Sequence, residues 1–134
     1  MKNLIALCML LLSFSASAKI IHLDCSAKIT TEIPKSSDFG KVYDYKIDID
    51  FEKETAKFGG WTDTILRTNP NEPAYKLTIG DEKIRLGDDI KGKWGYTINR
   101  STLEFRGRTE YSTLRYYEGS CVLVDKREKP KTAF

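Results

Sequence analysis

The sequence is poor in the residues that build metal and redox centres. It has one histidine, His22, and three cysteines, Cys8, Cys25 and Cys121. A structural zinc site takes four cysteine or histidine ligands at short spacings, which these positions do not provide. A Cys-x-x-Cys pair is also missing, so the motif of thiol–disulfide enzymes is excluded. We therefore expect neither a metal ion nor another cofactor.

Long apolar runs are absent apart from a short one near the N-terminus. Lys2, the apolar residues 4–12 and the small residues 16–18 form the three-part pattern of a secretory signal. A transmembrane anchor is the alternative, but this run is far shorter than the ~20 residues that a spanning helix needs. Cys8 lies inside the run, which argues against a lipoprotein. We expect residues 1–18 to be a cleaved signal peptide, with no membrane span afterwards.

A strong excess of one charge is absent as well. The chain has 22 basic and 19 acidic residues, and only Lys2 of the basic ones lies in the signal segment. A balance this near neutrality gives no electrostatic reason to expect a nucleic-acid partner. A glycine-rich phosphate loop and the nucleophile elbow of hydrolases are also missing. These absences point away from nucleotide-binding proteins and from the common hydrolases.

Helical periodicity is lacking after the signal segment, and alternation of apolar and polar residues takes its place. In VYDYKIDIDFE, residues 42–52, every second side chain from Tyr43 onward is apolar or aromatic, which is the period of a half-buried strand. Shorter alternating rows occur at 21–29, 75–79 and 94–98, and turn-forming residues separate them. The pattern predicts an all-β protein.

The number and spacing of these strands favour one particular architecture. About eight short strands joined by short turns predict a small antiparallel meander barrel, with a two-sheet sandwich as the alternative. Residues 19–134 have the length of a single domain, which ends in a basic tail from about residue 126. The interior of an eight-stranded barrel is barely wider than its own side chains, so inward aromatic residues would fill it.

Removal of the signal leaves two cysteines, Cys25 and Cys121, in a compartment where disulfides persist. Each shares an alternation row with apolar residues, Leu23 and Ala27 in one strand and Leu123 in the other. Both sulfur atoms should therefore face the core. We predict a structural disulfide between Cys25 and Cys121 that ties the first strand to the last, and two buried free thiols are the alternative.

His22, Asp24 and Ser26 have the residue types of a nucleophilic triad. Residues two apart on a strand are separated by nearly ~7 Å, and their side chains run side by side. The contacts of ~3 Å that a triad requires would need unusual bending of the strand. We expect an ordinary strand face here and assign no catalytic residue.

Asp44, Asp48, Asp50 and Glu52 line one face of the strand predicted at 42–52. Calcium takes about six to eight oxygen ligands from a loop that wraps the ion, which a paired strand does not provide. A glycosidase needs two carboxylates that face each other from different elements. Lys46 in the same row favours cross-strand ion pairing instead, so no metal ligand is assigned.

The segment 100–117, RSTLEFRGRTEYSTLRYY, is rich in arginine and tyrosine. Cations among aromatic side chains can bind single-stranded nucleic acid, but export removes most nucleic acid from reach. A patch for a protein or glycan partner is more plausible, since exposed tyrosine and arginine are enriched at interfaces. Arg100, Arg115 and Tyr116 are therefore the candidate contacts with a partner.

The last third of the chain carries a resemblance. YTINRSTLEF, then YEGSC and a terminal phenylalanine, resemble segments of small exported, mostly uncharacterised β-barrel-like proteins of Gram-negative bacteria. The matching positions are Cys25, Ile98, Arg100, Thr102, Leu103, Gly119, Cys121 and Phe134. The resemblance implies export and a β fold, and it transfers no activity, because fold alone does not define function.

These observations together predict an exported, non-enzymatic envelope protein, periplasmic or secreted, that binds a protein or a surface. Inhibition of a foreign hydrolase is one form of such binding. The alternative is a carrier that holds a small ligand inside the barrel. A large cavity with convergent polar groups would favour the carrier, whereas a filled core with an exposed aromatic patch would favour the binding protein.

Overall fold

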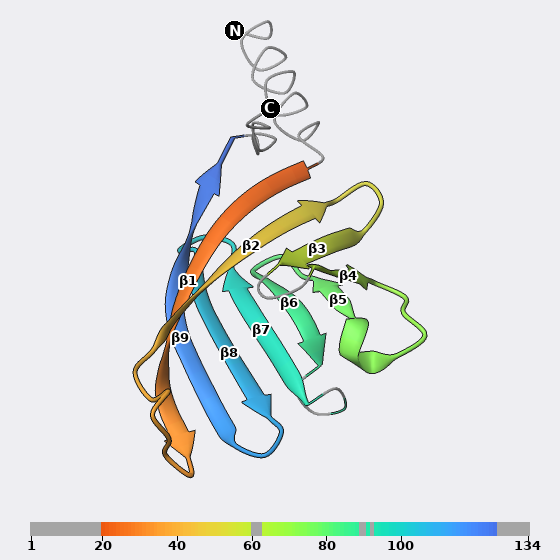
Figure 1. Ribbon diagram of the computed structural model, residues 1–134. Coiled ribbons are helices and arrows are strands. Elements are labelled where there is room, and N and C mark those ends of the chain that lie inside the picture. Colours follow the sequence, from red (N-terminus) through yellow and green to blue (C-terminus); the bar gives the residue numbers. More distant parts are fainter. Residues whose placement is uncertain (1–19, 60–62, 89–90, 92, 126–134) are drawn as a thin grey trace, which may run out of the picture.

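Nine strands form one antiparallel sheet that curls into a nearly closed barrel (Figure 1). The computed structural model describes residues 20–59, 63–88, 91 and 93–125, so the predicted signal peptide, the basic tail and Phe134 lie outside the described residues. The elements are β1 Ile20–Ile33, β2 Val42–Asp50, β3 Thr55–Gly59, β4 Asp63–Arg67, the short 3-10 helix η1 Pro73–Tyr75, β5 Leu77–Ile79, β6 Lys83–Asp88, β7 Trp94–Asn99, β8 Glu104–Glu110 and β9 Leu114–Val124. The predicted meander barrel is confirmed, with nine strands where about eight were expected.

The two ends of the sheet meet without forming a regular ladder. The strand order is β4-β3-β2-β1-β9-β8-β7-β6-β5, and each neighbouring pair is antiparallel. An odd number of alternating strands leaves the end strands β4 and β5 parallel, and one parallel bridge, Arg67 to Lys76, joins them. Parallel pairing of full strands needs a crossover of about a dozen residues, which the short connection does not supply. The barrel therefore stays incompletely closed at this seam.

The first and last strands pair at the centre of the sheet, and the disulfide lies between them. Cys25 is directly opposite Cys121 in the β1–β9 ladder, with their Cα atoms 3.9 Å apart. Both side chains are almost completely buried. The predicted Cys25–Cys121 disulfide is confirmed, and so is the pairing of the first strand with the last.

Alternation of buried and exposed residues accounts for the core. The largest fully buried side chains are Phe105, Leu23, Ile29, Ile47, Ile49, Leu66, Leu77, Ile84, Leu86 and Ile98. In β1 the alternation changes phase at Thr30, because the register with β9 shifts between Ile29 and Thr31. Because of this β-bulge, the next buried residue after Ile29 is Glu32, whose side chain lies inside the barrel.

Two residues depart from the alternation expected of them. Leu123 shares the row of Cys121 but is 61% exposed, because β8 reaches only as far as Glu104, opposite Ser120, and leaves the end of β9 uncovered on that side. Tyr75 was expected in a strand with Leu77, but it belongs to η1, which begins at Pro73, and is 44% exposed. Among the described residues, no helix has the length and hydropathy to cross a membrane.

Candidate binding site

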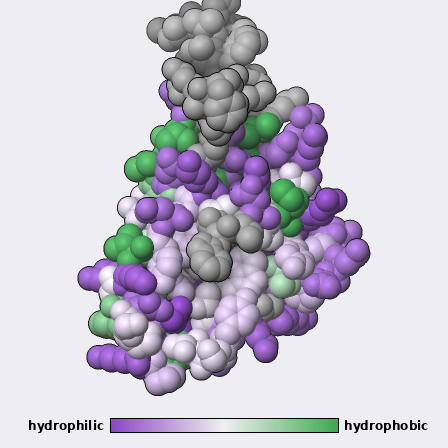
Figure 2. All heavy atoms as spheres, in the orientation of Figure 1, coloured by the Kyte–Doolittle hydropathy of each residue, from purple (hydrophilic) through white to green (hydrophobic). Residues whose placement is uncertain are grey.

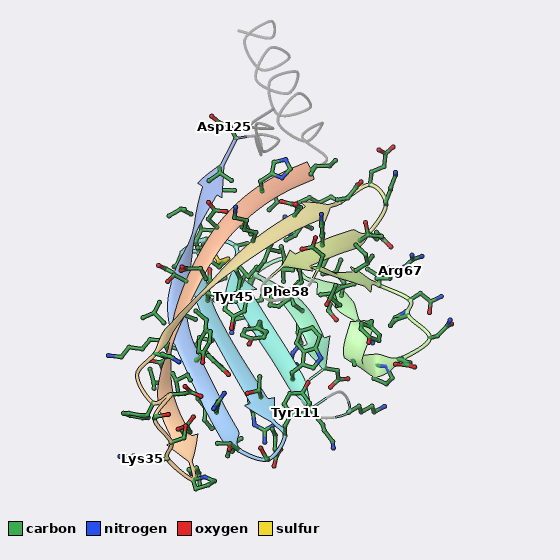
Figure 3. All side chains as sticks on the ribbon, in the orientation of Figure 1. Lys35, Tyr45, Phe58, Arg67, Tyr111 and Asp125 are labelled. Carbon is green, nitrogen blue, oxygen red and sulfur yellow. A yellow bond between two sulfur atoms is a disulfide. The ribbon has the colours of Figure 1, made fainter. Side chains whose placement is uncertain are left out.

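Aromatic side chains fill the interior of the barrel on one side of the disulfide. The rings of Tyr45, Phe58, Tyr96 and Phe105 lie with centroids 5.2 to 5.6 Å apart, and the Tyr96 and Phe105 rings are stacked. Figure 3 shows Tyr45 and Phe58 directed into the interior from β2 and β3. Rings this close are in contact, so no ligand fits between them.

Tyrosines extend this packing to one end of the barrel. The sequence has seven tyrosines, and six of them belong to one connected group, which we call the tyrosine cluster: Tyr43, Tyr45, Tyr75, Tyr96, Tyr111 and Tyr117. Ring contacts link Tyr43 to Tyr117 at 6.2 Å and Tyr117 to Tyr96 at 5.7 Å. Tyr75 and Tyr117 are close enough to Tyr111 to raise its pKa electrostatically, although burial is the larger cause.

Five different elements supply the cluster. Tyr43 and Tyr45 come from β2, Tyr75 from η1, and Tyr96 and Tyr117 from β7 and β9. The sixth, Tyr111, comes from the turn between β8 and β9. On the face that Figure 2 shows, in the orientation of Figure 1, pale side chains of intermediate hydropathy gather around the middle, with hydrophilic and some hydrophobic side chains around them. The fold thus brings together residues that are far apart in the sequence.

A glycine makes room for the most buried ring of the cluster. Tyr96 is opposite Gly107 in the β7–β8 ladder, and Gly107 is opposite Tyr117 in the β8–β9 ladder. A Cβ atom added at Gly107 would clash with the Tyr96 ring. The Tyr96 ring therefore lies across the glycine backbone, and a larger side chain there would displace it.

The cluster grades from buried to exposed rings. Tyr96 and Tyr117 are buried, Tyr43 and Tyr45 are half-buried, and Tyr75 is 44% exposed. Tyr111 is 66% exposed and lies at the lower end of the barrel in Figure 3. The outer rings of Tyr75 and Tyr111 are therefore accessible from solvent, while the inner rings are enclosed by the barrel.

Hydroxyl groups of the cluster hydrogen-bond one another in pairs. The Tyr45 and Tyr96 hydroxyl oxygens are 3.2 Å apart, and those of Thr109 and Tyr117 are 3.3 Å apart. The Arg115 side chain also donates to the Tyr117 hydroxyl. The cluster is thus linked by hydrogen bonds as well as by ring contacts, and Tyr117 joins it to Arg115.

The phenols of Tyr45 and Tyr96 stay neutral at physiological pH. Burial raises the pKa of Tyr45 to about 12, partly offset by the hydrogen bond with Tyr96. Burial, together with the nearby Tyr45 hydroxyl, raises the pKa of Tyr96 further. A general acid or base works best with a pKa near the working pH, so these phenols are poorly suited to proton transfer. They are suited to binding.

The raised pKa values predict that the protein loses stability in alkali. Unfolded tyrosine titrates near 10.0, whereas Tyr45 in the folded protein titrates at about 12. Between these values the folded state holds more protons, so the free energy of unfolding falls as the pH rises, by at most ~1.4 kcal/mol per pH unit for this group. Urea unfolding at pH 9, 10 and 11 measures the slope, and Tyr45→Phe should reduce it. An unchanged slope in Tyr45→Phe would contradict the assignment.

Charged residues near the cluster are tied into a network. The Arg115 side chain donates from Nε to the buried Glu32 carboxylate at 2.6 Å and from a terminal nitrogen to Asp38 at 3.3 Å. Lys41 pairs with Asp38 at 3.0 Å, and the Ser36 backbone N–H donates to Glu32. Two cations and two anions thus compensate each other.

The network keeps both of its carboxyl groups ionised at neutral pH. Burial alone would raise the pKa of Glu32, but the hydrogen bonds from Ser36 and Arg115 lower it below its ordinary 4.5. The hydrogen bond and charge of Lys41 lower the pKa of Asp38 in the same direction. Because both folded-state values are depressed, this stabilisation is present at neutral pH and is lost as the pH falls below about 4.5.

Because the Glu32 carboxylate is buried, removal of its partner Arg115 should destabilise the protein more than removal of a cation from an exposed pair of the same geometry. Arg106 and Glu104 on the outer wall are also 2.6 Å apart, but both are exposed. Arg115→Ala should lower the urea midpoint several times more than Arg106→Ala, because it leaves the Glu32 carboxylate inside the barrel without its cation. The exposed pair should contribute no more than ~1 kcal/mol. Equal effects of the two substitutions would show that burial of Glu32 is unimportant.

The three candidate contact residues do not form one patch. Arg100 lies at the β7–β8 turn, donates to the Gly80 carbonyl at 2.8 Å and sits over the Phe51 ring. Arg115 lies at the opposite end of β8 and points inward to Glu32. Tyr116, next to it on β9, is 41% exposed on the outer wall with Arg108 6.0 Å from its ring centre. Only Arg115 adjoins the tyrosine cluster.

The other constellations of the sequence have structural roles. His22 pairs with Asp48 across the β1–β2 ladder, with Nδ1 2.8 Å from Oδ1, and Lys46 is opposite Asp24. His22, Asp24 and Ser26 follow one another on the outer face of β1, as expected of an ordinary strand face. In the described part of the chain, no group of three or more histidine, cysteine or acidic residues is arranged to hold a metal ion.

Sequence reasoning missed the tyrosine cluster as a site. It placed Tyr43, Tyr45 and Tyr96 inward and treated them as core filling, and it counted Tyr111 among the aromatic residues of 100–117 without choosing it as a contact. The available signal was the number of tyrosines, seven in the chain, three of which fall on inward rows. Comparison of the chain with protein-family models, curated proteins and solved structures found no match. The geometry of the barrel and its tyrosine cluster is therefore the basis for the function.

Proposed function

We propose that this chain is an exported protein of the bacterial envelope, periplasmic or secreted, that binds a protein or surface partner through the tyrosine cluster. The observation that carries the proposal is the connection of six of the seven tyrosines in one group that reaches from the barrel interior to one end, where Tyr111 is exposed, with Tyr75 exposed as well. Tyrosine offers a large, rigid ring with a polar tip at a low cost in conformational entropy, which suits it to recognition.

A binding surface fits the interior better than a carrier does. A carrier needs a cavity that encloses its ligand, typically of several hundred Å³. Here the rings of Tyr45, Phe58 and Tyr96 touch one another where such a ligand would lie. The part of the cluster that a partner can reach is therefore the pair of exposed rings, Tyr75 and Tyr111.

The chemistry of the cluster supports binding without catalysis. Burial raises the pKa of Tyr45 to about 12 and also raises the pKa of Tyr96, and the carboxylates of Glu32 and Asp38 are engaged by cations. The proposed function uses no cofactor. Inhibition of the partner is one form of the proposed binding. The disulfide between Cys25 and Cys121 supports export, because such bonds persist in oxidising compartments.

The proposal is tested by binding of the mature protein to an envelope fraction. Immobilised wild-type protein should retain envelope material that the double variant Tyr75→Ala/Tyr111→Ala retains at least about tenfold less, since exposed aromatic side chains dominate such contacts. Tyr116→Ala is the matched control, because Tyr116 is an exposed tyrosine of the outer wall. Equal retention by the double variant, or an equal loss in Tyr116→Ala, would refute the proposal.

A further inference from the structure

We propose that this chain forms a dimer in which the end of β9 pairs antiparallel with the same segment of a second copy. The interface lies outside the tyrosine cluster and does not depend on the proposed function. Three properties of the described residues carry the inference: an open strand edge, aliphatic side chains exposed on both faces of that strand, and a sequence that is symmetric about Leu123.

Within the described chain, the last residues of β9 have a neighbouring strand on one side only. Pairing with β1 continues to Val124, whereas pairing with β8 ends at Ser120. Successive residues of a strand direct their backbone N–H and C=O groups to alternate sides. The Cys121 N–H donates to the Leu103 carbonyl oxygen at 2.8 Å on the β8 side, so Leu123 directs its N–H and C=O to that side as well. An open edge of this kind is a template for another strand.

Aliphatic side chains are exposed on both faces of this segment. Val122 is 57% exposed on the outer wall, and Leu123, which points the opposite way, is 61% exposed because β8 ends opposite Ser120. Figure 3 places Asp125, the residue after β9, at the end of the barrel away from Tyr111. Because the side chains of a strand alternate between its faces, an added strand covers both aliphatic residues and pairs with the open backbone groups at once. The occupant is therefore an extended polypeptide.

The sequence of the open segment selects a second copy as that polypeptide. Antiparallel pairing centred on Leu123 places this leucine opposite its own counterpart and Val122 opposite Val124, so the three central pairs are all aliphatic. The two leucines then exchange both of their open backbone hydrogen bonds. Centring the pairing on Val122 would bring Val124 against Ser120, which β8 already covers, and centring it on Val124 would set Leu123 against Asp125. The register about Leu123 is therefore favoured.

Sedimentation equilibrium of the mature, disulfide-bonded protein tests the inference. Pairing of so few residues buries less than the ~1,000 Å² of stable interfaces, so we expect a dissociation constant of about 10 µM to 1 mM. Over this range of protein concentration the average mass should rise from that of a monomer toward that of a dimer. A wild-type protein that stays monomeric throughout would overturn the inference.

Two matched variants locate the interface. Leu123→Lys should weaken dimerisation at least about tenfold, because two like charges would face each other at the centre of the pairing. Ile33→Lys is the control, since Ile33 is another strand residue that is 61% exposed, and it should dimerise like the wild-type protein. Both side chains are mostly exposed, so both variants should fold, and an unchanged thermal midpoint confirms this. Undiminished dimerisation of Leu123→Lys, or an equal loss in Ile33→Lys, would overturn the inference.

A mixture of two variants distinguishes self-pairing from other contacts of this edge. Leu123→Lys and Leu123→Glu should each be monomeric alone, whereas their equimolar mixture should dimerise, because the register sets the two opposite charges against each other. No association in the mixture would overturn the inference. Dimerisation of the wild-type sequence only after removal of residues 126–134 would also overturn it, because the chain's own tail would then occupy the edge. The proposed function is tested separately, through Tyr75 and Tyr111.

Discussion

Replacing Cys25 and Cys121 together by alanine is expected to lower the free energy of unfolding by ~2 to 5 kcal/mol. The two cysteines are 96 positions apart, so the disulfide closes a loop that includes most of the described chain and restricts the unfolded state strongly. Both side chains are almost fully buried, and they join strands that pair at the centre of the sheet. The same measurement on wild-type protein with its disulfide reduced should give a loss of similar size.

The neighbouring cross-strand pair provides a control for this substitution. Ser26 is opposite Ser120, one position along the same β1–β9 ladder, and both side chains face outward. Their replacement by alanine should change the free energy of unfolding by no more than ~0.5 kcal/mol for each residue. A loss below ~1 kcal/mol in the cysteine variant, or two titratable thiols in native exported protein, would show that the disulfide does not stabilise the barrel.

Gly119→Ala is expected to destabilise the same junction by ~1 to 3 kcal/mol or more. Gly119 is opposite Ala27, and an added Cβ would overlap the Ser26 carbonyl oxygen and approach the Ala27 Cα atom. These are backbone atoms that cannot rotate away, so β1 and β9 would have to separate. Separation there would also pull Cys25 and Cys121 apart, since their Cα atoms are only 3.9 Å from each other.

Urea unfolding and thiol titration measure the two consequences of Gly119→Ala. We expect a lower urea midpoint together with a larger fraction of free thiol than in the wild-type protein. Glu118→Ala, an exposed neighbour on the same strand, should show neither effect. A Gly119→Ala protein with wild-type stability and a fully formed disulfide would show that the close approach of β1 and β9 is not required.

The close approach of the β1 backbone to Gly119 gives a physical reason for the glycine that precedes Cys121 by two residues in the segment YEGSC. Gly119 and Cys121 lie two apart on the same face of β9, so the glycine admits the β1 backbone beside the position where the disulfide forms. The resemblance on which this segment was singled out implied only export and a β fold. The structure adds why a glycine is needed two residues before the cysteine.

Alternation made most of the fold predictable. A period of two places Leu23, Cys25 and Ala27 on one face, and the same rule orients the side chains of β2, β7 and β8. The disulfide was predicted from the two cysteines that remain once the predicted signal segment is set aside. Local patterns suffice here because each strand buries one face against a common interior.

Other features depend on pairing that a single sequence does not reveal. The bulge at Thr30 moves the buried position to Glu32, and no local pattern distinguishes this from a continuing strand. The Glu32 side chain, which points inward, forms an ion pair with Arg115, 83 positions away in the sequence. Tyr75 does not belong to the strand expected for it, because Pro73 begins a 3-10 helix just before β5.

The candidate site was the least predictable part of the molecule. Its tyrosines come from five elements, and their meeting depends on how the barrel curls and where its turns lie. Alternation identified Tyr43, Tyr45 and Tyr96 as inward but could not show that Tyr111, in a turn, reaches the same group. Arg115 was chosen as a surface contact, whereas it is engaged with Glu32 inside the barrel.

The central claim, that the tyrosine cluster is the binding surface, is tested most directly by tyrosine-selective chemical modification of wild-type mature protein. The protein is modified alone and while bound to the envelope fraction, and mass spectrometry gives the extent of reaction at each tyrosine. The account predicts that Tyr75 and Tyr111, both exposed in the free protein, become protected on binding while Tyr116 reacts as before. Protection of Tyr116 with unchanged reaction at Tyr75 and Tyr111 would contradict it.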